Sequence, residues 1–344
     1  SLELTEVNTS KQIKFIESLV IGHVVLKKIG NFDDKKVRKY IDDSIQKVKL
    51  NKYSNFYAVG GSFRALAKLH MHIKSEDLKI IQDYEVDSAE FLNELRTRVF
   101  VNKNTVDEKF LSQLFKSRKK SIPYTFNVLE MLVQKMSIKK IFFTNTGVRE
   151  GILYDLVKDK GVDPFLSQIR KIARGTIKKR NAEKLFSWIL PFNDILKMDQ
   201  NLLLSACWLT NIASALHPEH RRIFALEKIL YHQFFHLDRQ NRIMLALILY
   251  FRYSNNLKEN FALSYSEKIS KKNLIKVKIL GQLLRMAHHI TGRLNYNNLD
   301  HCKLTINSIN EVNFKAKKTY LLFGQSFERG IKNISNAFES LKRN

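Results

Sequence analysis

Segments whose apolar residues have strand spacing alternate with segments whose apolar residues have helical spacing along the first 160 positions. The first 30 residues read as strands: residues 1–7 alternate polar or small with apolar side chains, and residues 18–22 look like the returning strand of a hairpin. Apolar residues recur at helical spacing over 33–48, and short apolar runs predict strands at 56–60 and 140–144. Strands that alternate with helices predict an α/β fold for this half.

The second half has a different pattern. A turn over residues 161–164 is expected to separate two domains, residues 1–160 and residues 161–344. Beyond the turn, apolar residues recur at helical spacing, for example Leu280 and Leu284, and predict a mostly α-helical domain. After residue 305 the pattern alternates again, which predicts a small β element before a last helix.

One strand-to-helix junction in the first half has residues that could bind a ligand. The strand over 56–60 runs into Gly60, Gly61 and Ser62, and Leu66 and Leu69 then follow at helical spacing. Glycines allow close approach of a ligand to the backbone, and the first N–H groups of a helix have no internal partner, so this turn can bind an anion. Ser62 would lie at or near the N-cap, where its hydroxyl can cap the helix or contact a phosphate. The alternative is a tight connection with a capping serine and no ligand.

Charge strengthens the case for an anionic partner. The chain has 59 Lys and Arg against 33 Asp and Glu, a formal net charge of +26. A polyanion is the natural partner of such a chain: nucleic acid, a membrane surface or polyphosphate. The alternative is solvated surface charge, because Lys is plentiful throughout the chain together with Asn and Ile, as an AT-rich genome would encode.

A compact basic segment lies at 116–120, where four cations fall within five residues before Pro123. It is either a positive edge that binds an anion or a solvated basic loop. The only two cysteines, Cys207 and Cys302, lie far apart with no metal-ligand spacing, which fits a reducing cytoplasm. No apolar run reaches the roughly 20 residues of a membrane helix, and no signal-peptide pattern is visible.

Several stretches carry a family resemblance. Residues 1–7, 18–22 and 59–70 resemble the exopolyphosphatase and guanosine pentaphosphate phosphohydrolase (Ppx/GppA) family of the actin-like ATPase superfold. Residues 147–154, Gly-Val-Arg-Glu-Gly-Ile-Leu-Tyr, resemble the Leu-Arg-Glu-Gly-x-Leu-Tyr string with which that family closes its second lobe, where its role is mainly architectural. The resemblance implies an actin-like (ribonuclease H-like) lobe over residues 1–160.

The resemblance also implies roles for individual residues. The family's first phosphate loop reads Asp-x-Gly-Gly-Gly-Ser-x-Glu, and this chain opens on its last part, Ser1-x-Glu3. Ser1 would contact phosphate, and Glu3 would assist with metal or water. Gly60, Gly61 and Ser62 would form the second phosphate loop. The cations that would hold polyphosphate are Arg118, with Lys119 or Arg64.

The implied reaction is hydrolysis of terminal phosphoanhydride bonds of inorganic polyphosphate or guanosine pentaphosphate, with Mg²⁺ (or Mn²⁺) as cofactor. We expect the chain to lack the first actin-like lobe and the glycine loop, and so to be weakly active or inactive without them. A homodimer is one assembly that the family adopts. Nothing in the sequence separates the two substrates.

The second half resembles the HD-phosphodiesterase-like helical domain of family members over residues 206–212 and 217–222. True HD phosphohydrolases bind metal through a His-Asp pair, but this chain has Asn211 where Asp is expected, and no His-Asp dipeptide. His232, His236 and Asp238 form His-x-x-x-His-x-Asp, which fits either a metal-binding helix face or a packed aromatic helix.

Two other functions stay open. A non-enzymatic basic helical protein that binds nucleic acid rests on charge alone, because no helix-turn-helix, RNA-binding aromatic motif or zinc finger is visible. An HD-type metal phosphohydrolase in the second half would require tightly bound Mn²⁺, Fe²⁺ or Zn²⁺, and Asn211 argues against it.

Overall fold

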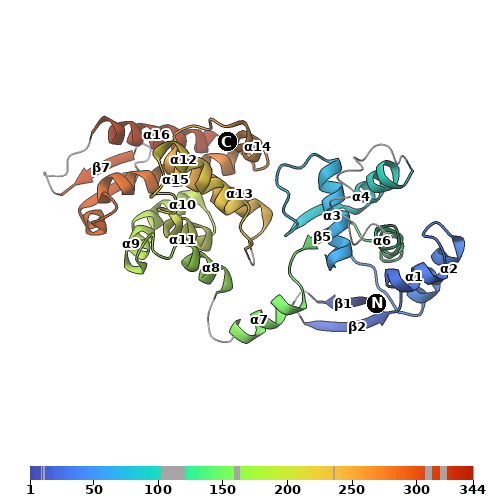
Figure 1. Ribbon diagram of the computed structural model, residues 1–344. Coiled ribbons are helices and arrows are strands. Elements are labelled where there is room, and N and C mark those ends of the chain that lie inside the picture. The colour runs from blue at the N-terminus through green and yellow to red at the C-terminus, as the bar shows by residue number, and fades with distance from the viewer. Residues whose placement is uncertain are drawn as a thin grey trace. The chain divides into compact units, whose positions relative to one another are not determined.

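A computed structural model describes residues 1–8, 10, 12–101, 121–158, 163–234, 237–306, 312–317 and 324–343. The chain divides into two compact units, Ser1–Gly151 and Ile152–Asn344. Each is described by itself (Figure 1). The boundary expected between residues 160 and 161 falls on a segment, 159–162, that lies outside the described residues.

The first unit begins with an antiparallel hairpin, β1 (Leu2–Val7) and β2 (Ile13–Leu19). The hairpin was expected, but its second strand begins earlier than residue 18. The strand reading of the first 30 residues is wrong beyond the hairpin, because His23–Ile29 forms helix α1. Leu26 of α1 is fully buried, and α1 packs against α6 (Ile122–Met136), so tertiary contact outweighs the β-branched Val24 and Val25.

A three-stranded sheet forms the centre of the first unit, in the order β3 (Asn55–Val59), β5 (Lys140–Thr144), β4 (Tyr84–Asp87). β3 and β5 are parallel, as the strand–helix–strand reading requires, and β4 is antiparallel to β5. The expected strands at 56–60 and 140–144 are therefore confirmed. Strand β4 has only four residues and was not predicted.

One face of this sheet is covered and the other is exposed. Ala58, Ile141 and Phe143 are fully buried in a core shared with α3 (Gly61–Ile73) and α6. On the opposite face Tyr57 is 64% exposed, and its ring stacks on Phe142 with centroids 5.1 Å apart. The other helices in the described part of the unit are α2 (Lys35–Gln46), α4 (Ser88–Leu95), the π-helical η1 (Arg96–Val101) and α7 (Val148–Lys158), which continues past the unit boundary.

The second unit is helical, as predicted. Its helices are α8 (Pro164–Ile172), α9 (Lys179–Ile189), η3 (Leu190–Phe192), α10 (Asn193–Leu196), α11 (Gln200–Leu209), α12 (Pro218–Leu230), α13 (Arg239–Tyr253), α14 (Asn260–Ser266), α15 (Lys271–Thr291), η4 (Tyr296–His301) and α16 (Gln325–Arg343). A hairpin of β6 (Cys302–Ile306) and β7 (Val312–Ala316) precedes α16, so the small β element is confirmed.

Helix α13 is the core of this unit. Residues 242–252 are buried all round, and α13 packs against α11, α12 and α15 (Figure 1). Its long apolar run is thus explained by burial inside a helical domain. None of the described helices is long and apolar enough to cross a membrane.

Candidate phosphate-binding site

The two parallel strands bring two turns to the same edge of the sheet. Val59, the last residue of β3, is paired in register with Thr144, the last residue of β5. Each strand then passes through a short turn into a helix, α3 after β3 and α7 after β5. The N-termini of two helices therefore lie at neighbouring positions, where ligands of parallel sheets commonly bind.

The first turn leaves the start of α3 open. Gly60 is the N-cap residue, with φ 115° and ψ 162°, a conformation that glycine adopts without the strain that a side chain brings. No side chain caps the helix, and the first backbone bond runs from the Arg64 N–H to the Gly60 carbonyl, at 3.0 Å. Ser62 lies in the first turn of the helix, not at the cap. The early N–H groups and the Ser62 hydroxyl are thus available for an anion.

The second turn is held by hydrogen bonds. The Thr144 hydroxyl donates to Oε1 of Gln82 at 2.9 Å, and the Asn145 N–H donates to the same oxygen at 3.0 Å. The Thr146 N–H donates back to the Thr144 hydroxyl at 3.0 Å. A Cβ added to Gly147 would lie 3.9 Å from Cγ1 of Val59, so this turn lies directly beside β3.

Two charged groups belong to these turns. Nε of Arg64 is buried and has no hydrogen-bond partner among the described residues. The carboxylate of Glu150 accepts a hydrogen bond from the Gly147 N–H at 2.7 Å. That hydrogen bond holds the pKa of Glu150 below its usual range, and the charges of Arg149 and Arg64 act in the same direction. Arg64 is therefore a cation with a spare donor, and Glu150 is an anion fixed close to it.

Ser1 and Glu3 lie on the hairpin. Ser1 is beside the start of α1, because a Cβ on Gly22 would lie 2.7 Å from the Ser1 backbone nitrogen. Glu3 is exposed on the outer face of β1. The hydrogen bond from the Tyr53 hydroxyl to Glu6, at 2.6 Å, attaches the far end of β1 to the start of β3. No side-chain hydrogen bond or ion pair among the described residues joins Glu3 to the Gly60 turn, and its catalytic role stays a prediction.

Arg118 and Lys119 fall within 102–120, outside the described residues. Their predicted contact with polyphosphate is therefore untested. Of the predicted phosphate-binding residues, the structure places Gly60, Gly61, Ser62 and Arg64 together.

Comparison with protein families identifies the chain. Residues 1–160 match the Ppx/GppA phosphatase family, and residues 196–327 match the C-terminal domain of exopolyphosphatase. The chain belongs to the Ppx/GppA phosphatase family. The resemblance seen in the sequence is thereby confirmed, and the first unit is an actin-like, ribonuclease H-like lobe of a phosphohydrolase family. No curated protein matches the chain significantly.

The described part of this Ppx/GppA chain does not contain a ready metal site. No group of three or more His, Cys, Asp or Glu side chains comes together there. Glu150, whose carboxylate senses the charge of Arg64, is engaged with the Gly147 N–H. The requirement for Mg²⁺ or Mn²⁺ stays a prediction.

The metal motif of the second half has structural roles. His232 lies in the connection between α12 and α13, so the helical reading of His-x-x-x-His-x-Asp is wrong. Asp238 is the N-cap of α13 and accepts the Asn241 N–H at 2.8 Å. The buried guanidinium of Arg242 donates to the carbonyls of Ile229 and Leu230, each at 3.3 Å, and so closes the C-terminus of α12. His236 lies outside the described residues.

Asn211 also has a structural role. Its amide donates to the hydroxyl of Tyr296 at 3.0 Å and to the carbonyl of Thr176 at 3.3 Å. Both Asn211 and Tyr296 are buried. The HD-like character of this domain stays a prediction.

Sequence reasoning missed the partners of the second turn. Gln82, Thr144 and Thr146 had no assigned role, although Thr-Asn-Thr-Gly after a strand is itself a turn signal. Gln82 could not be found from sequence, because it lies 62 positions before Thr144 and meets it only through the fold.

Proposed function

We propose that the Gly60 turn and Arg64 bind the terminal phosphates of inorganic polyphosphate or guanosine pentaphosphate. Water attacks the terminal phosphorus, the phosphoanhydride bond breaks, and orthophosphate and a shorter chain leave. The observation that carries the proposal is the open start of α3 beside Arg64, whose buried Nε has no partner among the described residues. A phosphate oxygen is the acceptor that such a group takes most favourably.

The neighbouring helix adds a second positive end. The N-terminus of α7 lies at the same sheet edge, so its partial positive charge adds to that of α3, although the carboxylate of Glu150 already occupies the Gly147 N–H. The charge of +26 supports attraction of a long polyanion toward the protein as a whole. Family membership supports the phosphoanhydride substrate class.

The proposal includes a requirement for Mg²⁺ or Mn²⁺. Restoration of activity to chelator-treated protein by either ion tests this requirement, and full activity in the presence of the chelator would contradict it.

The competing function is general nucleic-acid binding. A preference for polyphosphate over DNA would distinguish the proposed function from it. Binding of long polyphosphate and of single-stranded DNA is measured at several matched salt concentrations for the wild type, Ser62→Ala and Arg118→Ala. We expect polyphosphate to be preferred and both substitutions to weaken it selectively, Ser62→Ala by about tenfold for one hydrogen bond to a charged group. Equal binding of both polymers, with the same salt slope and no response to either substitution, would favour generic charge attraction.

A further inference from the structure

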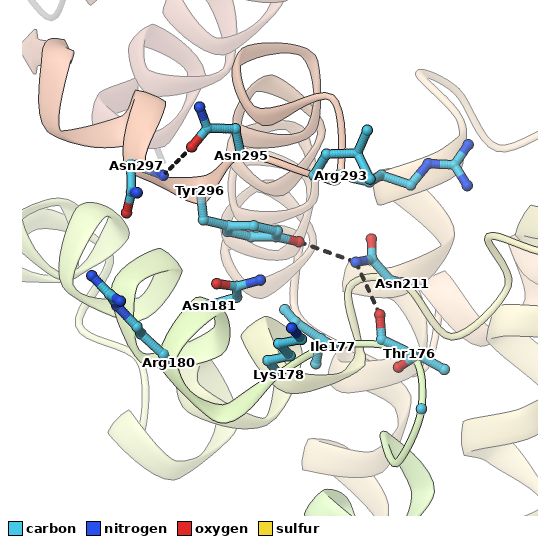
Figure 2. A pocket seen from close by; sticks show the side chains of 12 residues that line it. Thr176, Ile177, Lys178, Arg180, Asn181, Asn211, Arg293, Asn295, Tyr296 and Asn297 are labelled. Carbon is cyan, nitrogen blue, oxygen red and sulfur yellow. Dashed lines mark hydrogen bonds between the residues drawn. The ribbon is translucent and has the colours of Figure 1, made fainter.

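The second unit contains a hollow that no part of the proposed function uses. Its volume is about 640 Å³, within the range of small-molecule sites. One wall is the segment from Gly175 to Asn181, which leads into α9, and the other is the segment from Arg293 to Asn297, which leads from α15 into η4. Figure 2 shows the two walls facing each other across Tyr296.

The base of the hollow is fixed by hydrogen bonds. The Tyr296 hydroxyl points to Asn211, whose amide also holds the carbonyl of Thr176 (Figure 2). Lys184 of α9 donates to Oδ1 of Asn297 at 2.8 Å, which ties η4 to α9. These contacts join the two walls before any ligand arrives, so little ordering cost remains for binding.

The charged residues that line the hollow are all positive. Three of its lining residues are cationic, Lys178, Arg180 and Arg293, and none is acidic. Nη1 of Arg293 donates to the Ser214 carbonyl at 3.1 Å. By contrast, the side chains of Lys178 and Arg180 are exposed and have no partner among the described residues.

Backbone geometry adds to this charge. Lys178 is the N-cap of α9, an 11-residue helix, and no side chain caps it. The positive end of α9 therefore opens beside the two unpaired cations. Asn181, in the first turn, offers an amide that no described residue bonds.

A buried cation lies close to the base. Arg252 is 3% exposed, and its Nη2 has no partner among the described residues. Its Nε donates to the hydroxyl of Thr210, the neighbour of Asn211, at 3.2 Å. Burial lowers the pKa of Arg252 to about 10; Tyr253 and Tyr296 oppose this shift, and the positive charges of Arg285 and Arg293 add to it. Arg252 therefore stays protonated at neutral pH, with no acidic side chain among the described residues acting on it.

We propose that this hollow binds a phosphorylated compound of nucleotide size. Lys178, Arg180 and the start of α9 hold its phosphate, and its organic part lies between Asn181 and the Tyr296 wall. The size of the hollow exceeds what a single phosphate fills, and amide and aromatic groups suit a polar ring. This site belongs to the second unit and does not depend on the Gly60 turn.

Calorimetric titration of residues 1–344 with guanosine 5′-monophosphate, guanosine and inorganic tripolyphosphate tests the proposal. We expect the nucleotide to bind at least tenfold more tightly than guanosine, because the phosphate supplies the charge-assisted bonds. Tripolyphosphate that displaces the nucleotide with equal or higher affinity would show a plain phosphate site and overturn the assignment of a nucleotide-sized ligand.

Matched variants locate the site. Lys178→Gln with Arg180→Gln should weaken nucleotide binding at least tenfold, whereas Lys171→Gln with Lys272→Gln removes the same charge at exposed positions outside the hollow and should change it less than twofold. Arg64→Ala should leave nucleotide binding unchanged, so this site is tested separately from the Gly60 turn. Absent nucleotide binding, or equal loss in both double variants with native circular dichroism, would overturn the proposal.

Discussion

The carboxylate of Glu150 accepts a hydrogen bond from the backbone N–H of Gly147, with 2.7 Å between Oε2 and N. This contact caps the start of α7 and fixes the turn that follows β5 beside Val59. It also places a negative charge near Arg64, at the edge where we propose that phosphate binds. Glu150 therefore both fixes the turn at the site and repels an anionic ligand there.

Glu150→Gln should separate these two effects. A glutamine keeps an oxygen that can accept the Gly147 N–H but removes the negative charge, so polyphosphate binding should tighten, by about two- to fivefold at low salt. The gain should shrink as salt is added, because the effect is electrostatic. Weaker binding by a folded variant would mean that Glu150 assists the ligand.

Gly60→Ala should destabilise the first unit through backbone strain alone. The added Cβ meets nothing within 4 Å, but the φ of 115° costs an alanine about 1–3 kcal/mol. Gly151→Ala is the matched control, since Gly151 lies inside α7 with equally open space and no positive φ, and it should be neutral or stabilising. Thermal unfolding of the two variants tests this prediction. Equal melting temperatures would show that the Gly60 backbone conformation does not strain an alanine.

Glu130 is a buried carboxylate held by two arginines. It is 4% exposed, and it pairs with Arg96 of η1 and, at 3.5 Å, with Arg38 of α2. Arg96→Met should cost about 3 kcal/mol of unfolding free energy, because it leaves a buried charge poorly compensated. Arg38→Met removes the longer, more exposed contact and should cost below about 1 kcal/mol. Urea unfolding that ranks the variants in the opposite order would contradict this assignment.

His288 should contribute to acid sensitivity of the second unit. Burial lowers its pKa to about 3, and the positive charges of Arg252 and Arg293 act in the same direction, followed by His289 and Arg221. Since the unfolded histidine has a pKa near 6.5, its contribution is fully present above that pH and is lost as pH falls toward 3.

The check is a comparison with His288→Gln. Urea unfolding at pH 7.5, 6 and 5 should show that the wild type loses more stability than the variant across this window. Parallel losses in both proteins would show that His288 titrates in the folded state as it does in the unfolded state.

Local pattern was enough to predict the elements that carry the site. Short apolar runs identify β3 and β5, and the two glycines after β3 locate the start of α3. Segments whose structure depends on distant contacts were not predictable. Residues 23–29 look like a strand and form α1 because Leu26 is buried against α6, while β4 is too short to give a distinct pattern.

In the candidate site, too, the local features could be predicted and those that depend on distant contacts could not. Gly60 and Ser62 were found from the sequence, because the turn is local. The link between Thr144 and Gln82, and the unpartnered Nε of Arg64, depend on packing between segments and are visible only in the structure. The same holds for the hollow beside Tyr296, whose walls are more than 100 residues apart in the chain.

The most direct measurement compares Arg64→Ala with Lys68→Ala in binding of long polyphosphate at fixed salt. Both substitutions remove one positive charge from α3, and Lys68 lies exposed one turn further along the helix. If the Gly60 turn holds the terminal phosphates, Arg64→Ala should weaken binding about tenfold and Lys68→Ala less than twofold. Equal effects of the two substitutions would contradict the account.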